Sequence, residues 1–177
     1  MLRPYGGDVE LLFAMPEYKV PLPGASRGES QNDVFALAHV GDLTFAVTVE
    51  GKVGEPFSEK LGDWLQNASD GKLERLDCIC ELLGLTQPLP NDIYYQLLHR
   101  TASAVIEARK FKTDAAAMIV HSFSPKRERF EDFVRFASLF GVAVEADMIG
   151  RLIAVRPKAK PPLYIGWACG DCKYLNS

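Results

Sequence analysis

The sequence predicts an α/β fold, in which a single domain over residues 1–177 has a mixed central sheet flanked by helices. Three observations indicate this class. Hydrophobic residues make up 47% of the 177 residues and charged residues 24%, a balance typical of one soluble globular domain. Two apolar runs joined by Gly41-Asp42 predict a β-hairpin. Downstream, segments with helical periodicity alternate with uninterrupted apolar runs, an order typical of α/β proteins.

The first part of the chain predicts a helix followed by the hairpin. We expect a helix over about residues 7–18, with Glu10 on its polar side. After a polar loop come two hairpin strands, at 33–40 and 43–52. Because side chains alternate along a strand, one hairpin face is apolar throughout and is the expected core face. That face carries Val34, Ala36, Ala38 and Val40 against Leu43, Phe45, Val47 and Val49.

The second part of the chain predicts helices around one buried strand. The run AlaAlaAlaMetIleValHis at 115–121 lacks polar alternation, which is typical of a strand buried on both faces. Gly84 is a candidate C-cap, Asn91 a candidate N-cap, and Ser124-Pro125 a helix start. The expected helices span 58–67, 73–83, 92–110 and 125–140, and the expected short strands 142–145, 151–155 and 163–168.

The hairpin brings two acidic residues together away from its turn. With Gly41 and Asp42 at the turn, Asp33 faces Glu50, and Lys52 projects from the same face as Glu50. Opposed like charges are destabilising, and a Mg²⁺ or Mn²⁺ ion would neutralise them, since Mg²⁺ prefers carboxylates together with water and phosphate. Lys52 could then stabilise the charge that develops on a phosphate. The alternative is a lysine-bridged pair at a solvated strand end.

The order of these residues resembles the PD-(D/E)xK nuclease superfamily, which has the restriction-endonuclease-like fold. The resemblance rests on Asn32-Asp33, the hairpin and Glu50-Gly51-Lys52, in a helix, hairpin, helix, strand order that covers roughly residues 7–125. The segments SerGlnAsnAspValPheAlaLeu and TyrGlnLeuLeuHisArg also resemble an uncharacterised bacterial group in that superfamily. Asn32 stands where the motif has proline, a departure that removes no metal ligand.

The resemblance implies a restriction-endonuclease-like core and a role for each matching residue. Asp33 and Glu50 would be ligands of Mg²⁺ or Mn²⁺, and Lys52 would be the catalytic lysine. Some members of the superfamily add an acid from the first helix, for which Glu10 is the candidate metal ligand. Some also add a glutamine from the helix after the strands, for which Gln96 is the candidate. Neither of these two residues has a motif of its own here.

The combined expectation is a metal-dependent nuclease that acts on nucleic acid, with DNA as the expected substrate. The runner-up is a binding or regulatory module that keeps the nuclease fold without turnover. The net charge of −3 favours this runner-up, because phosphate contacts dominate nucleic-acid affinity, whereas the intact acid, acid, lysine set favours the enzyme. No apolar run could span a bilayer and no secretory pattern begins the chain, so a cytoplasmic protein is expected. A homodimer that cuts both strands is an open alternative to a monomer.

Basic and cysteine-containing segments offer further candidates. Residues 151–177 carry a net charge of +4, and their proline-containing part at 156–162 is either a nucleic-acid contact or a solvated tail. Cys169 and Cys172 have the spacing of a zinc site, with reduced thiols as the alternative.

The long helix expected over 92–110 has an apolar face and an opposite polar stripe. Near this stripe, His99 with Arg100 is a candidate phosphate contact. The stripe comprises Gln96, Arg100, Ser103 and Glu107.

Overall fold

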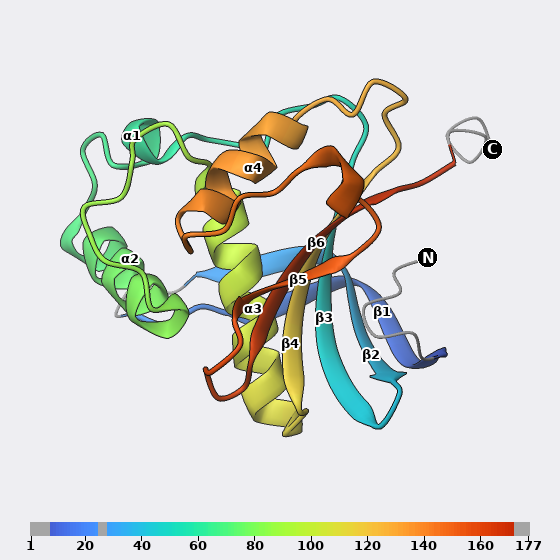
Figure 1. Cartoon of the computed structure of the whole chain (residues 1–177). Helices are drawn as coiled ribbons and strands as arrows, with labels where there is room; N and C mark the ends of the chain where they lie inside the picture. Colours follow the sequence, from blue (N-terminus) through green and yellow to red (C-terminus); the bar gives the residue numbers. More distant parts are fainter. Residues whose placement is uncertain (1–7, 25–27, 172–177) are drawn as a thin grey trace.

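The computed structural model describes residues 8–24 and 28–171, which form one six-stranded mixed sheet with helices packed on it (Figure 1). The strand order is β1-β2-β3-β4-β6-β5. Strands β1, β2 and β3 are antiparallel neighbours, β3, β4 and β6 run parallel, and β5 is antiparallel to β6. The mixed α/β architecture is therefore confirmed. The strands are β1 Val9–Pro21, β2 Glu29–Val40, β3 Leu43–Lys52, β4 Ala115–Ser122, β5 Leu152–Arg156 and β6 Leu163–Cys169.

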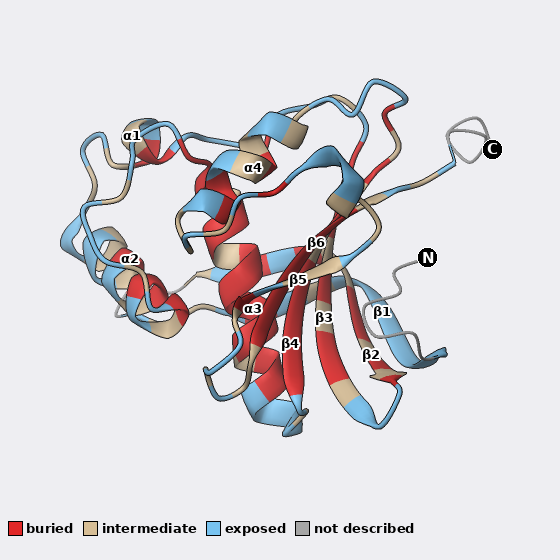
Figure 2. Ribbon diagram, viewed as in Figure 1, coloured by how far each residue is buried: buried red, intermediate tan, exposed pale blue. Residues whose placement is uncertain are grey.

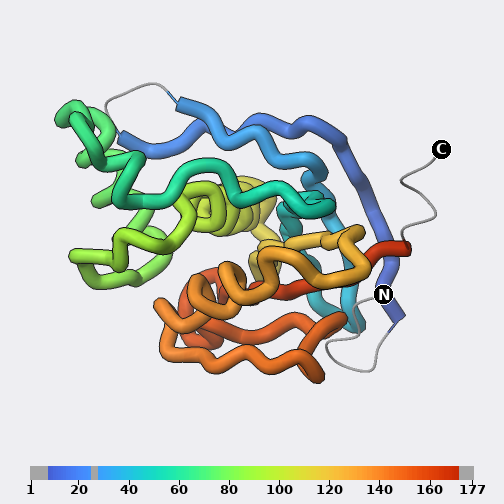
Figure 3. The backbone as a smooth tube through the Cα atoms, turned by 90° about the horizontal axis from the view of Figure 1, so that it is seen from above, coloured from blue at the N-terminus to red at the C-terminus, as the bar shows by residue number. Residues whose placement is uncertain are grey.

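Helix α3 is the main element that covers the sheet. It contacts β1, β2, β3 and β4, while α4 packs on β6. Seen from above, α3 lies between α2 and the strands (Figure 3), and Figure 2 shows that most of α3 is buried. No helix in the described part of the chain is long and apolar enough to cross a membrane. The helices are α1 Leu61–Trp64, α2 Asp70–Leu83, α3 Tyr95–Phe111 and α4 Phe130–Ser138, with a 3-10 turn at Ala146–Met148.

The helix expected over 7–18 is wrong, because the described part of this segment is strand β1, paired with β2 along most of its length. The apolar run Leu11–Met15 has no polar alternation, so the local sequence does not distinguish a helix from a strand. Pairing with β2 satisfies backbone groups that an unpaired edge of the hairpin would leave open. Glu10 therefore lies on an edge strand and not on a helix.

The register of the hairpin is as predicted, but its core face is not. Strands β2 and β3 pair in the expected register from Val40↔Leu43 onward. The main core lies on the opposite face, under the helices, where Phe35 and Ala46 are fully buried. The polar residues at the far end of the hairpin are thus covered by α3. The predicted face forms a smaller cluster of strand residues: Val40, Phe45, Ala115, Ala117 and Tyr164.

The end of α2 is predicted correctly from the local sequence, whereas the bounds of α1 and α3 are not. Gly84 is the C-cap of α2 as predicted, with a left-handed φ of 65° and a hydrogen bond from Leu85 N–H to Cys80 O. The helix expected over 58–67 is reduced to α1. Helix α3 begins three residues later than predicted, because the segment before it pairs with the start of α1: Leu61 N–H donates to Ile93 O at 2.7 Å.

Downstream of α3 the strands are predicted better than the helix. The expected strands at 115–121, 151–155 and 163–168 are confirmed as β4, β5 and β6. Helix α4 begins only at Phe130, because Arg127 and Arg129 have left-handed φ values of 54° and 70° that interrupt a helical backbone. Residues 142–145 contain no strand.

Candidate active site

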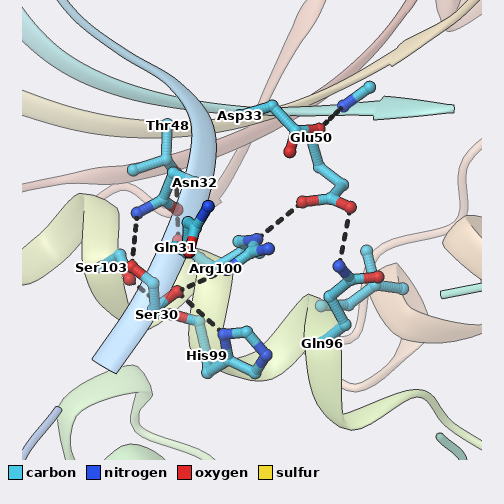
Figure 4. A network of polar contacts seen from close by, with 12 residues as sticks. Ser30, Gln31, Asn32, Asp33, Thr48, Glu50, Gln96, His99, Arg100 and Ser103 are labelled. Atoms are coloured by element: carbon cyan, nitrogen blue, oxygen red, sulfur yellow. Dashed lines mark hydrogen bonds and ion pairs between the residues drawn. The ribbon is translucent and has the colours of Figure 1, made fainter. Parts of the chain in front are cut away.

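Polar side chains from β2, β3 and α3 meet at the end of the hairpin that lies away from its turn (Figure 4). Strand β3 supplies Glu50 and Lys52, α3 supplies Gln96 and Arg100, and β2 supplies Asp33. The parallel strands β3 and β4 both end here. Open α/β sheets usually bind ligands outside the carboxyl ends of their parallel strands, so the cluster lies where such a fold places a binding site.

Glu50 is the centre of the cluster, with only 3% of its surface exposed. Its Oε1 accepts hydrogen bonds from Lys52 Nζ at 2.8 Å and from Gln96 Nε2 at 2.7 Å. Its Oε2 accepts a hydrogen bond from Arg100 Nε at 2.6 Å. A carboxylate in a protein interior is stable only when it is paired and hydrogen-bonded. These three donors therefore explain how Glu50 can be buried.

Lys52 is fixed beside Glu50 by contacts on several sides. Its side chain is buried, and Nζ lies 3.8 Å from Glu55 Oε1 and 5.3 Å from the centre of the Phe57 ring. Glu55 is itself anchored, since it accepts hydrogen bonds from the N–H groups of Val53 and Gly54. The ammonium group is thus a positive charge of fixed position at the end of β3.

Asp33 lies where β2 separates from β3. Regular pairing of the two strands stops at Val34↔Val49, and the Asp33 carboxylate then accepts a hydrogen bond from the backbone N–H of Gly51 at 2.6 Å. Burial raises the pKa of Asp33; the Gly51 hydrogen bond opposes this rise, and the charge of Glu50 adds to it. The two acids therefore act on each other although strand pairing ends before it reaches them.

A second set of contacts lies behind Glu50. Arg100 donates from Nη1 to Ser30 Oγ at 2.9 Å, and Ser30 Oγ lies 2.8 Å from His99 Nδ1 (Figure 4). Burial, together with the charges of Arg100 and Arg75, lowers the pKa of His99 to about 3. The imidazole is therefore neutral at physiological pH and can accept a hydrogen bond from the Ser30 hydroxyl group. His99 and Arg100 take part in this buried network, which argues against the candidate phosphate contact at these two residues.

The structure brings Gln96 into the cluster but not Glu10. Gln96 donates to Glu50, while its Oε1 is buried and has no hydrogen-bond partner among the described residues. A buried amide oxygen without a partner is costly, so a bound water or ligand would gain a contact there. Glu10 lies on β1 opposite His39, at 3.7 Å from its Nδ1. About 20 Å of strand β2 separate His39 from Asp33.

Arg100 is the residue of the cluster whose place the sequence reasoning missed. A polar stripe opposite an apolar helix face usually faces solvent, yet Arg100, Ser103 and Glu107 of α3 are all buried. The signal in the sequence that could have indicated its place is the spacing, because Arg100 follows Gln96 by four positions and so lies one helical turn further along the same stripe. Arg100 and Lys52 together balance the charges of the two acids.

The oxygen atoms of the cluster suit a hard divalent cation. Asp33, Glu50 and Gln96 all offer oxygens, and Mg²⁺ commonly takes one or two carboxylates and completes its shell with water and phosphate. Both carboxylate oxygens of Glu50 already accept hydrogen bonds from cationic side chains. Among the described residues no group of three His, Cys, Asp or Glu side chains is placed to hold a metal ion. A Mg²⁺ ion at this site would therefore have to share the Glu50 oxygens with Lys52, Gln96 and Arg100, and it would keep much of its water.

The cysteines form no metal-binding group within residues 8–24 and 28–171. Cys169 is an exposed free thiol at the end of β6, and Cys172 lies outside the described residues. The zinc alternative for this pair therefore stays a prediction. Cys78 and Cys80 are free thiols on α2, and burial, assisted by the charge of Asp77, raises the pKa of Cys80 to about 11.

Comparison with known proteins gives one result. A family model described as a domain of unknown function, DUF6946, matches residues 2–172. No curated protein and no solved structure gives a significant match.

Proposed function

The chain belongs to the DUF6946 family, and from the geometry of its site we propose that it is a metal-dependent nuclease, which hydrolyses phosphodiester bonds of nucleic acid, with DNA as the substrate. The observation that carries this proposal is the meeting of Asp33, Glu50 and Lys52 at the carboxyl-terminal edge of β3. Two carboxylates and a lysine are groups that a metal-assisted attack of water on a phosphodiester can use.

Asp33 and Glu50 would hold a Mg²⁺ or Mn²⁺ ion. When bound, such an ion supplies positive charge that polarises the phosphate and lowers the pKa of a bound water. Lys52, fixed between Glu50 and Glu55, places a second positive charge where negative charge develops on the phosphate. Gln96 offers its unpartnered Oε1 to a water or to the substrate.

Arg100 is a positioning residue in this proposal. Its Nε holds one oxygen of Glu50, and its Nη1 holds Ser30 on the neighbouring strand. Because the guanidinium is buried behind the carboxylate, it reaches the reaction only through Glu50. Its role is to fix the direction in which Glu50 presents its oxygens.

The order of elements around the site supports the likeness to the PD-(D/E)xK fold. The hairpin that carries both acids is followed by α1, α2 and the long helix α3, and then by β4, which is parallel to β3. The segment before the hairpin departs from the likeness, since β1 stands where a helix was expected. The proposed restriction-endonuclease-like core therefore rests on residues 29–122.

We expect Asp33→Asn to abolish metal binding without harming the fold. Millimolar Mn²⁺ or Mg²⁺ should raise the Tm of the wild type, because a ligand that binds only the native state stabilises it, and the variant should not respond. Without metal, the free energy of unfolding of the variant should equal that of the wild type or exceed it by up to about 1 kcal/mol. The reason is that the amide oxygen of asparagine can still accept the hydrogen bond from Gly51 N–H, while the negative charge near Glu50 is removed. Differential scanning fluorimetry measures both effects.

Glu10→Gln is the matched control for this experiment. It also removes one carboxylate from the sheet, but about 20 Å away along the strands, and it should keep the metal response. A metal response of Asp33→Asn equal to that of the wild type would remove Asp33 from the ligand set. A marked loss of metal-free stability would make it a structural residue instead.

Cleavage of supercoiled plasmid DNA should require both the metal and Lys52. Lys52→Met keeps an aliphatic chain against the Phe57 ring but removes the charge, so the cleavage rate should fall at least about 10²-fold. The readout is the appearance of nicked and linear plasmid over time in Mg²⁺, in Mn²⁺ and in EDTA. Equal rates for variant and wild type, purified side by side, would assign the cleavage to a contaminant.

A binding module without turnover is the second candidate, and one observation favours it. Lys52 and Arg100 already pair with Glu50, so the buried carboxylate needs no metal ion to be neutralised. Such a module would bind a labelled DNA duplex in the presence of Ca²⁺ yet show neither a metal-dependent rise in Tm nor cleavage. The assays above separate the two functions.

A further inference from the structure

The basic segment at 156–162 lies at the opposite end of the sheet from the candidate active site. Pro162 O accepts a hydrogen bond from the N–H of Ala116, at the start of β4. Lys52 instead pairs with Ser122, at the end of β4. The stretch of strand between these points is about 20 Å long. The charges of the segment therefore belong to another surface.

A cavity of about 150 Å³ opens beside this segment, between α2, α3 and the β5–β6 connection. Three cationic side chains line it: Arg109 from α3, Arg156 from the end of β5 and Lys160 from the connection. We propose that this cavity is a phosphate-binding pocket, distinct from the Glu50 site and independent of the nuclease proposal. Its ligand is a phosphate group, either free or part of a nucleic-acid backbone.

Arg156 is held in place before any ligand binds. Its Nη1 donates to Leu82 O, in the last turn of α2, at 3.3 Å. Its guanidinium lies against Gly84, where an added Cβ would come within 2.4 Å of Arg156 Cζ. The missing side chain of Gly84 thus makes room for the guanidinium. A cation that is already positioned loses little freedom on binding, and its other N–H groups remain for a ligand.

Arg109 and Lys160 are exposed cations on the wall of the cavity. Within residues 8–24 and 28–171, no ion pair joins either of them to a carboxylate. Glu81 on the cavity wall and the partial negative charges at the ends of α2 and α3 offset part of the positive charge. Against three cations, an excess of about one positive charge remains, which attracts a single anion.

The size of the cavity limits the ligand. Its 150 Å³ exceed the roughly 30 Å³ that one liquid water occupies, but fall below the roughly 300 Å³ of pockets that enclose drug-sized molecules. A single phosphate group is of this size, whereas a whole nucleotide is larger. Arginine favours phosphate in particular, because its planar fork of N–H groups matches two phosphate oxygens at once.

The test removes the two exposed cations and titrates the folded chain with inorganic phosphate. Isothermal titration calorimetry at constant ionic strength, with chloride as the reference anion, should show phosphate binding to the wild type. The double variant Arg109→Gln/Lys160→Gln should bind at least about tenfold more weakly. The matched control Arg151→Gln/Lys158→Gln removes two basic residues from the same part of the chain that do not line the cavity, and it should bind within about twofold of the wild type.

Fluorescence anisotropy with a labelled DNA duplex identifies the source of the phosphate. Loss of inorganic-phosphate binding alone in the double variant would identify a free phosphate as the ligand. A parallel loss of DNA affinity, absent from the control, would show that the pocket also takes a backbone phosphate. The proposal is overturned if the wild type binds neither probe, or if the control variant loses as much affinity as the double variant, which would indicate a diffuse charge effect.

Discussion

Replacing Arg100 by methionine should lower the free energy of unfolding by about 3–5 kcal/mol, the usual cost of breaking a buried ion pair. Methionine fills much of the same volume but leaves Glu50 Oε2 and Ser30 Oγ without their donor. For a domain of this length the loss corresponds to a fall in Tm of roughly 6–20 °C. Urea unfolding followed by circular dichroism measures it.

Arg135→Met provides the comparison on the surface of the same chain. Arg135 pairs with Asp92 at 3.2 Å and with Asp132 at 3.5 Å, and its own side chain is about half exposed. Ion pairs of this kind contribute at most about 1 kcal/mol each. If Arg100→Met costs no more than Arg135→Met, Glu50 is neutralised by Lys52 alone. In that case the positioning role of Arg100 is lost as well.

Acid should destabilise the protein through His99. The pKa of His99 is lowered from 6.5 to about 3 in the folded chain. At pH values between about 3 and 6.5, His99 is therefore protonated in the unfolded chain but not in the folded chain. The free energy of unfolding therefore falls as the pH drops below 6.5, by about 3 kcal/mol between pH 7 and pH 4. Urea unfolding at each pH gives the slope.

The variant His99→Asn isolates this contribution. An asparagine amide can still form a hydrogen bond with Ser30 Oγ but does not titrate. The excess in free energy of unfolding of the wild type over the variant should therefore shrink steadily as the pH falls. Carboxylates, including Asp33, titrate in both proteins and cancel in the difference. His39→Asn, which removes an exposed imidazole on β2, is the control and should keep the slope of the wild type. Parallel slopes for wild type and His99→Asn would contradict the prediction.

The elements that could be predicted depend on residues close together in the sequence. Gly41-Asp42 determines the hairpin register because a two-residue turn leaves one way to align its strands. Gly84 ends α2 because a left-handed backbone suits glycine. The apolar run at 115–121 becomes β4, a central strand whose side chains are largely buried on both faces of the sheet.

The site was predicted in part, and for the same reason. The register of one hairpin places Asp33 near Glu50, and alternation adds Lys52, so these residues follow from local geometry. The resemblance suggested Gln96, which α3 does carry to Glu50. Arg100 could not be placed, because the sequence does not tell which face of α3 turns to the sheet.

By itself, the sequence determined the mixed α/β class, the hairpin register and the acidic pair with its lysine. Only the tertiary structure decided that residues 9–21 form β1, because this segment pairs its backbone with the edge of β2 that would otherwise stay open. It also decided that the polar stripe of α3 is buried. The physical reason is the carboxylate of Glu50: once β3 and α3 enclose it, its charge must be met from within the core, and Arg100 is the cation on α3 that reaches it.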